Sequence, residues 1–378
     1  MRSPNIRYLP AIDHLRACAA LLIVLYHGLH LFSYQARFQA SFGIDHWLQP
    51  GNVLLAALAE GHTAVALFMV LSGFILTLGS LDDAVEYRPF IRNRLLRTYP
   101  LFLLLVVAGA AAAPQQFTWP AFLQTVFWFG NLPGALVAPP FTSMLWTIAV
   151  EWQFYLVFPL LLASLKGGWT RTLLGMLAVL LLFRMLAVMS GGNARDLAYS
   201  TILGRLDQFL IGMWAAWWYR RHPLSRGRGA LAALLALAGV VIALAAFNRA
   251  GGWPVTADWK VLWPTLEGVL WAAFLVGYVN WANAGSATWS RPLAWVGEIS
   301  YSIYLVHFVI IHTMLESGFV LLPTGRPVVD AMLTTLLLVL PATLLVSALT
   351  YRFVEAPFLR LRGRYRRTPV PTPDAGQA

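Results

Sequence analysis

Charged residues are scarce in this sequence, and long apolar runs take up most of it. Asp, Glu, Lys and Arg make up 11% of its 378 residues, whereas hydrophobic residues make up 59%. Soluble domains carry about 25% charged residues, so the composition excludes an average soluble protein. Runs of about 17–25 apolar residues recur along the chain, each long enough to cross a bilayer as a helix. No strand-like alternation competes with them. The composition predicts an all-α polytopic membrane protein.

Cysteine and the common catalytic motifs are also in short supply. The single cysteine, Cys18, excludes an intramolecular disulfide framework. The sequence has no H-E-x-x-H, G-x-x-x-x-G-K-[ST] or G-x-S-x-G motif and no clustered cysteine ligands. Metal hydrolysis, nucleotide hydrolysis and an α/β-hydrolase mechanism therefore lose their usual support, and we expect no metal.

The basic residues indicate how the chain crosses the membrane. Lys and Arg number 27 against 16 Asp and Glu, and they gather in short segments between apolar runs, which is typical of cytoplasmic loops. This charge reports topology rather than nucleic-acid binding. We expect ten spans, at about residues 12–34, 61–80, 99–113, 144–164, 170–190, 204–219, 229–247, 260–282, 294–316 and 328–351.

An eleventh apolar segment, residues 119–132, is short and ends in NLPG. Leaving it out of the count places the most basic segments and the basic tail on one side, as the positive-inside tendency favours. We therefore predict a bundle of about ten helices with both termini cytoplasmic, and residues 114–143 as an outer loop with an interfacial aromatic segment. Residues 1–358 would form one membrane domain, and residues 359–378 a basic, then Pro-rich tail that we expect to be disordered.

Ionisable residues inside the apolar runs mark a candidate site. Arg16 and His27 are eleven residues apart, about three helical turns, so they share one face roughly 16 Å apart. On the predicted topology His27, His307 and Glu151 all lie about 20 Å from the cytoplasmic edge. We predict His27 as a general base that Arg16 and Glu151 position, with Tyr155 one turn from Glu151. The alternatives are a structural histidine and a carboxylate neutralised for packing.

Two other spans carry polar residues. Ser300, Tyr304 and His307 stand at i, i+4 and i+7, a stripe typical of residues that line a substrate path or pore. Hydrogen bonding between helices is the alternative. Ser72 and Gly73 interrupt the second span, where a missing side chain leaves room for a thin ligand or for close helix packing, the latter being the default.

Arginines stand at the ends of two spans. Arg94 and Arg97, at i and i+3, begin the third span. A pair of forked guanidinium groups suits phosphate, so we predict that they hold a phosphorylated cytoplasmic donor. Setting the membrane orientation is the alternative. Arg205 stands two residues before Asp207, and we expect these two to form an interfacial ion pair.

Six stretches, taken in order, resemble the successive signatures of the bacterial membrane acyltransferase-3 family: IDHLRACAALLIVLYH, FMVLSGFIL, RNRLLRTYP, LWTIAVEWQFYLVFPLL, GEISYSIYLVHF and YRFVEAPF. The similarity covers residues 12–358. It implies a bundle of about ten helices with both ends inside. It also implies that Arg16 and His27 form the family's R-x10-H pair required for activity. The family's R-x-x-R motif, associated with the acyl-CoA donor, falls on Arg94 and Arg97.

The resemblance implies an integral membrane O-acyltransferase of the bacterial inner membrane. It would transfer an acyl group, expected to be acetyl, from cytoplasmic acyl-CoA to a hydroxyl of an extracytoplasmic or lipid-linked carbohydrate. Arg94 and Arg97 would hold the CoA phosphates, and Ser72 and Gly73 would border the pantetheine path. His27 would deprotonate the acceptor or form an acyl-His intermediate, and the sequence leaves both routes open.

Two rival functions remain at this stage. One is a transporter of a small acid or a lipid-linked sugar that uses the buried His and Glu as a proton relay. Such transporters often carry internal repeats, and none is visible in this sequence. The other is a catalytically idle receptor or scaffold, which leaves the buried ionisable residues unexplained.

Overall fold

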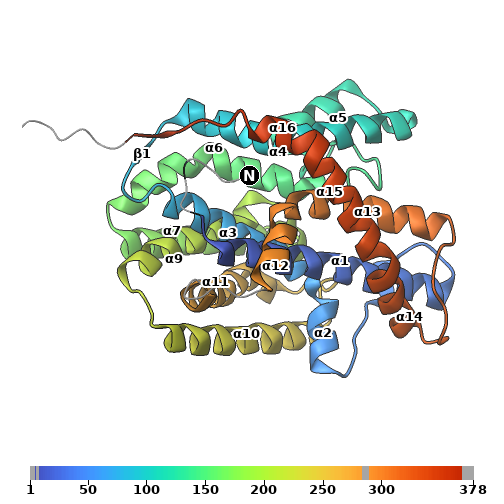
Figure 1. Cartoon of the computed structure of the whole chain (residues 1–378). Helices are drawn as coiled ribbons and strands as arrows, with labels where there is room; N and C mark the ends of the chain where they lie inside the picture. The colour runs from blue at the N-terminus through green and yellow to red at the C-terminus, as the bar shows by residue number, and fades with distance from the viewer. Residues whose placement is uncertain (1–4, 6–7, 283–288, 368–378) are drawn as a thin grey trace, which may run out of the picture.

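Helices form nearly all of the computed structural model, which describes residue 5, residues 8–282 and residues 289–367 (Figure 1). The longer helices are α1 (Pro10–Phe38), α3 (Ala64–Leu78), α4 (Tyr87–Ala112), α6 (Leu145–Lys166), α7 (Trp169–Met189), α9 (Ile202–Arg221), α10 (Arg226–Arg249), α11 (Trp263–Ala282) and α13 (Ser300–Glu316). The shorter helices are α2 (Val53–Ala59), α5 (Trp119–Gln124), α8 (Ala194–Ser200), α12 (Ser290–Glu298), α14 (Pro327–Thr334), α15 (Leu340–Thr350) and α16 (Ala356–Leu359).

Short irregular helices and one strand pair complete the fold. The 3₁₀ turns are Ile44–His46, Gly61–Thr63, Pro114–Gln116 and Asp258–Val261. The π-helical turns are Thr125–Phe129, Thr335–Val339 and Tyr351–Glu355, and the last two join α14, α15 and α16 into one rod. Strands β1 (Ala84–Val85) and β2 (Arg366–Arg367) pair antiparallel.

Seven helical segments of the described chain are long and apolar enough to cross a membrane: Pro10–Phe38, Gly61–Leu78, Tyr87–Ala112, Leu145–Lys166, Trp169–Met189, Arg226–Arg249 and Pro327–Leu359. Helices α12 and α13 pass the same test only together, across a 69° bend. Helices α9 and α11 lie outside this set; each has 20 residues, and α9 carries four charges. The all-α membrane class is thus confirmed, whereas ten crossings remain a prediction.

The segment at residues 119–132 does not form a span. Helix α5 and the π turn after it end at Phe129, and Trp128 has a positive φ of 72° that breaks the helix. The eleven residues 119–129 would reach about 16 Å as a helix, well short of a bilayer. The structure agrees with leaving this segment out of the count.

The two ends of the described fold meet. The Asn5 side chain donates to the Gly363 carbonyl at 3.0 Å and accepts from the Tyr365 N–H at 2.9 Å. Tyr365 is buried, and its ring packs edge-on against Phe90 at 5.3 Å. Residues 359–367, assigned to the tail by sequence, therefore belong to the folded domain, because backbone pairing and a buried ring hold them. Residues 368–378 lie outside the described residues.

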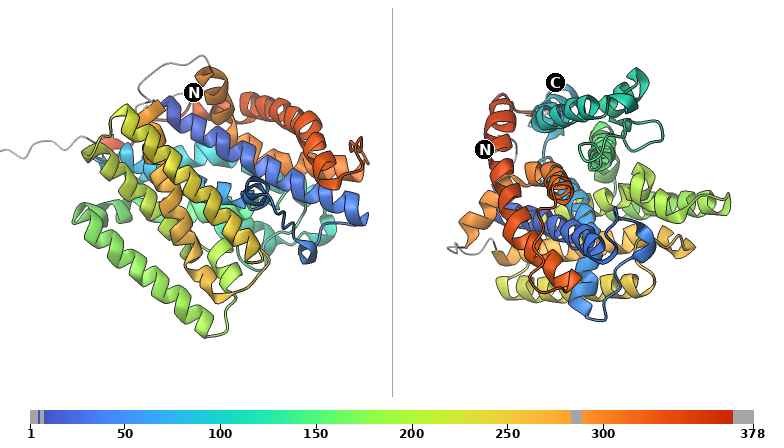
Figure 2. Two further views of the ribbon diagram at one scale, coloured as in Figure 1. Left: turned by 90° about the horizontal axis from the view of Figure 1, so that it is seen from below. Right: turned by 90° about the vertical axis from the view of Figure 1, so that its right-hand side faces the viewer.

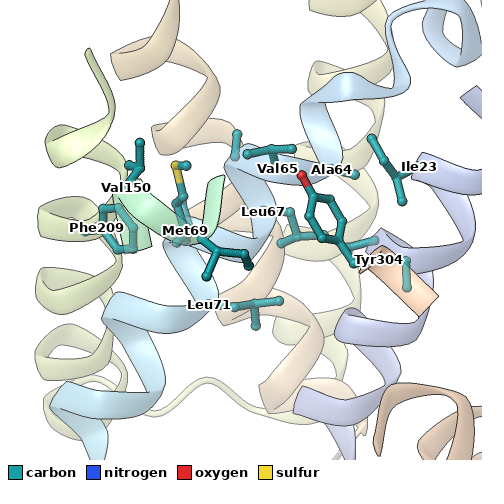
Figure 3. Close-up of a cluster of buried hydrophobic side chains, with 14 of the residues drawn as sticks. Ile23, Ala64, Val65, Leu67, Met69, Leu71, Val150, Phe209 and Tyr304 are labelled. Atoms are coloured by element: carbon teal, nitrogen blue, oxygen red, sulfur yellow. The ribbon is translucent and has the colours of Figure 1, made fainter. Parts of the chain in front are cut away.

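The long helices lie side by side around α1 and α3. In Figure 1 α1, α3, α6 and α10 run in the same general direction, and Figure 2 shows the same bundle from below and from its right-hand side. Figure 3 shows part of the core between them, where α3 side chains such as Leu67 and Met69 meet Phe209 of α9 and Ile23 of α1. The outward faces of α7 and α10 are apolar and exposed, as a bilayer requires.

Two buried ion pairs join α7, α9 and α11. Arg184 on α7 contacts Asp207 at 2.7 Å, and Arg205 contacts Glu267 on α11 at 3.4 Å. The expected pair between Arg205 and Asp207 is wrong, because residues two apart on a helix point to different sides. Each charge instead finds a partner on a neighbouring helix, as buried charges must.

Candidate functional site

A cavity opens between α1, α3, α4, α6, α9 and α13. It encloses about 850 Å³ when the open solvent at its mouth is included. Its walls include eight residues that the sequence singled out: Arg16, Ser72, Arg94, Arg97, Glu151, Tyr155, Ser300 and Tyr304.

The cavity has two chemically different ends. Arg16, Arg94 and Arg97 line one end, which lies where α1 and α4 begin. Val65 and Phe68, from the start of α3, line the other end. They lie roughly 10 Å or more along the helix axis from Ile75 and Leu76, which line the cavity near the end of α3. We call these the arginine end and the apolar end. A ligand with a charged head and a thin apolar arm fits this division.

The arginine end carries positive charge that the described residues only partly offset. Arg94 is buried, and its guanidinium lies over the Tyr155 ring at 5.6 Å. Its Nε atom has no hydrogen-bond partner among the described residues. Arg16 donates to Asp13 at 3.3 Å. Just outside the spans, burial and then the positive charges of Arg97 and Arg94 lower the pKa of Arg362 to about 10. A buried, unsatisfied donor among like charges suits an anionic ligand.

Glu151 is anchored in the cavity wall by its two predicted neighbours. Its Oε1 atom accepts a hydrogen bond from Ser72 at 2.6 Å and one from Tyr155 at 2.5 Å. The bond from Ser72 links α3 to α6, whereas the bond from Tyr155 lies within α6. Glu151 is not among the hydrogen-bond partners found for His27 in the described residues, so the expectation that it orients His27 directly is not met.

Gly73 faces away from the cavity. A Cβ atom placed there would lie 2.1 Å from the Phe209 carbonyl oxygen, and one at Gly212 would lie 2.1 Å from the Val70 carbonyl oxygen. The two glycines let the α3 and α9 backbones touch. The prediction that Gly73 borders the pantetheine path is therefore corrected. Gly73 serves close helix packing, the default interpretation, and only Ser72 of the two residues lines the cavity.

His27 and His307 meet just past the apolar end. The His27 Nδ1 and His307 Nε2 atoms lie 3.0 Å apart, and the His307 Nδ1 atom lies 3.0 Å from the Ile303 carbonyl oxygen. Neither histidine lines the cavity. Tyr304, three residues before His307, does line it, and its ring centroid is 6.0 Å from that of His307. Arg16 and His27 therefore occupy one helix but not one cavity wall.

Sequence reasoning missed five polar or aromatic residues of the wall: Phe68, Thr98, Thr147, Phe209 and Tyr301. Thr147 donates to the Tyr304 hydroxyl at 2.9 Å and so helps to close the apolar end. Phe68 packs edge-on against the Tyr304 ring at 6.0 Å. Tyr301 donates to the Thr98 carbonyl at 2.7 Å. Helical spacing could have found two of them, because Thr147 precedes Glu151, and Phe68 precedes Ser72, by four residues.

Comparison with known proteins bears on this geometry. The model of the acyltransferase-3 family, described as an acyltransferase domain, matches residues 9–352. The chain belongs to this family. The acyltransferase MdmB of Streptomyces mycarofaciens is 28% identical over 402 residues, covering 98% of this chain and 96% of MdmB. The O-acetyltransferase OatA of Staphylococcus aureus is 25% identical over 403 residues, covering 96% of this chain and 58% of OatA.

The extent of the match differs between these relatives. The chain spans about 58% of the length of the staphylococcal relatives that it matches. No solved structure matches it. The resemblance seen in the sequence motifs is thus confirmed over nearly the whole chain. Among its described residues, no group of three or more His, Cys, Asp or Glu is arranged to hold a metal ion.

Proposed function

We propose that this family member is a membrane O-acyltransferase. It transfers an acyl group from acyl-CoA to a hydroxyl of an extracytoplasmic or lipid-linked carbohydrate. The observation that carries this proposal is the cavity that runs from three arginines to the vicinity of the paired histidines. The family match supports acyl transfer over transport. The name of OatA, an O-acetyltransferase, favours acetyl as the group transferred.

The arginine end would take the phosphates of the donor. Arg94 and Arg97 present planar, forked donors that match phosphate oxygens, and the unsatisfied Arg94 Nε atom supplies one such donor. Ser72 and Tyr155 lie further along the same cavity and would border the pantetheine arm. The positive-inside tendency places this end at the cytoplasm, where acyl-CoA is available. The protein would therefore lie in the bacterial inner membrane.

The histidine pair would serve the acceptor. His27 takes the proton of the acceptor hydroxyl, the oxygen attacks the thioester carbonyl, and the carbon–sulfur bond breaks. The CoA thiolate leaves and takes up the proton that His27 removed from the hydroxyl, which restores the neutral base. A route through an acyl-His intermediate would use the same side chain as nucleophile. Both routes require His27 and place the reacting carbonyl beyond the apolar end of the cavity.

A mass-spectrometric comparison tests this function. Surface glycans of cells with and without the gene should differ by one acyl unit. A gene carrying His27→Ala should behave like the deletion although the protein is inserted normally, because the base is lost without disturbing the helix. His222→Ala, at an exposed position, is the matched control and should retain acylation. Glycan acylation at the parental level in the His27→Ala strain would rule out His27 as the catalytic group.

A further inference from the structure

We propose that His307 is a positioning residue that sets the tautomer of His27. A chain of two hydrogen bonds runs from the Ile303 carbonyl through His307 to His27. The inference rests on the proposed function, in which His27 acts on the acceptor hydroxyl. It concerns which nitrogen of His27 carries the proton before the reaction begins.

The first bond determines the protonation of His307. A backbone carbonyl can only accept a hydrogen bond, so the His307 Nδ1 atom, 3.0 Å from the Ile303 oxygen, must carry the hydrogen. His307 is fully buried, and no carboxylate pairs with it among the described residues. A charged imidazolium there would lack compensation, so the ring is neutral. Its Nε2 atom then carries a lone pair and acts only as an acceptor.

The second bond passes this constraint on to His27. Because the His307 Nε2 atom can only accept, the His27 Nδ1 atom, 3.0 Å away, must donate. The Ile23 carbonyl, one turn before His27, also accepts from this ring and favours the same tautomer. The Nε2 atom of His27 is then left unprotonated, which is the state that a general base needs. The His27 ring also lies edge-on between Tyr26 at 4.7 Å and Phe308 at 5.2 Å. These contacts restrict ring rotation, so the free nitrogen keeps one direction.

The same bond would help during the reaction. When the His27 Nε2 atom takes the hydroxyl proton, the ring becomes an imidazolium and its Nδ1–H becomes a stronger donor to His307. His307 remains neutral and gains no proton. An imidazole thus takes the orienting role that many hydrolases give to a carboxylate. Glu151 is free to bond Ser72 and Tyr155 instead.

Kinetics of two variants at one position test the proposal. In purified protein, His307→Leu removes the acceptor and should lower kcat by about 100-fold or more. The KM for acyl-CoA should stay within about threefold, because the donor cavity is untouched. His307→Gln offers an acceptor oxygen to His27 and an amide donor to Ile303. Its kcat should therefore be at least about tenfold higher than that of His307→Leu. His312→Leu, half-buried on the same helix, is the control and should leave kcat unchanged.

Nitrogen NMR of histidine-labelled wild-type protein gives a readout independent of variant folding. The His27 signals, identified by their loss in His27→Ala, should show a protonated Nδ1 and a bare Nε2 atom. A bare Nδ1 atom, or parental kcat in folded His307→Leu, would overturn the proposal while His27 remained catalytic. Retained activity in His27→Ala would instead defeat the proposed function itself. An equal loss in the Gln and Leu variants, with KM raised, would show that His307 only packs.

Discussion

At the scale of single residues, Arg94 and Arg97 stand apart from the two arginines that precede them on α4. Arg88 and Arg92 are exposed, whereas Arg94 is buried and Arg97 is half-buried, and only the latter two line the cavity. Positive charge anywhere at a cytoplasmic end serves orientation. Burial of a guanidinium in a cavity wall requires a reason beyond orientation, because an unmet donor there costs about 1–3 kcal/mol.

The double substitution Arg94→Lys/Arg97→Lys separates the two roles. It preserves the positive charge but replaces each planar fork with a point charge, so acyl-CoA binding should weaken by about 5- to 150-fold, which corresponds to about 1–3 kcal/mol. The measurements are the Kd and the KM for acyl-CoA in correctly inserted protein. Arg88→Lys/Arg92→Lys is the matched control and should bind the donor like the parent. Unchanged acyl-CoA affinity in both double variants would mean that Arg94 and Arg97 only set the orientation of the protein in the membrane.

At the scale of elements, the contact between α3 and α9 holds the cavity wall in place. Ser72 faces the cavity, while its neighbour Gly73 lies against the Phe209 carbonyl. Phe209 itself lines the cavity and stacks on Phe154 of α6 at 4.0 Å. The backbones therefore meet on one side of α3 so that its other side can present Ser72. Spacing the two helices further apart would move the wall.

Gly73→Ala should lower stability more than activity in the residual folded protein. The added Cβ atom would lie 2.1 Å from backbone, which cannot move aside as a side chain can. We expect a loss of about 1–3 kcal/mol, measured as a lower Tm and a lower folded yield. Gly175→Ala on α7 is the control, because a Cβ there meets nothing within 4 Å. A normal Tm with a raised KM for acyl-CoA in Gly73→Ala would revive the ligand-path role.

At the scale of the whole molecule, the meeting of the two ends constrains how the chain crosses the membrane. Asn5 bonds both Gly363 and Tyr365, so α1 begins where the rod of α14 to α16 ends. Ends on the same side require an even number of crossings. Arg220 near the end of α9 contacts Asp82 just after α3, and Lys166 at the end of α6 contacts the Asp83 carbonyl. Arg366 of the C-terminal segment also contacts Asp83, so these loops gather at the same end as the termini. This agrees with an even number of crossings, and ten remains a prediction.

Reporter fusions test this topology. A reporter that is active only in the periplasm should be active when fused near Pro139, in the predicted outer loop, and inactive when fused near Ser225, between α9 and α10. The physical reason is that the basic segments gather on the side of the termini, which the positive-inside tendency assigns to the cytoplasm. The opposite pattern at both positions would mean that the molecule is inverted. Activity at both, or at neither, would contradict ten alternating crossings.

The class of the protein and its candidate residues follow from the sequence alone. An apolar run of about 20 residues has only one common solution in a bilayer, so the runs predict helices without knowledge of their neighbours. Each of the ten predicted segments overlaps a long helix, the bent pair α12 and α13, or the rod of α14 to α16. Ionisable residues in such runs are costly, which is why Arg16, His27 and Glu151 could be singled out. Depth along each helix followed from the rise per residue.

Only the tertiary structure decided which of these residues meet. Helical period gives the face that residues share, but not the rotation of one helix against the next or the distance between them. Thus Arg205 pairs with Glu267 rather than Asp207, and His27 with His307 rather than Glu151. Packing between elements likewise places Gly73 against the α9 backbone and holds residues 359–367 in the folded domain. Partner choice depends on inter-helix packing, which a single chain's periodicity does not contain.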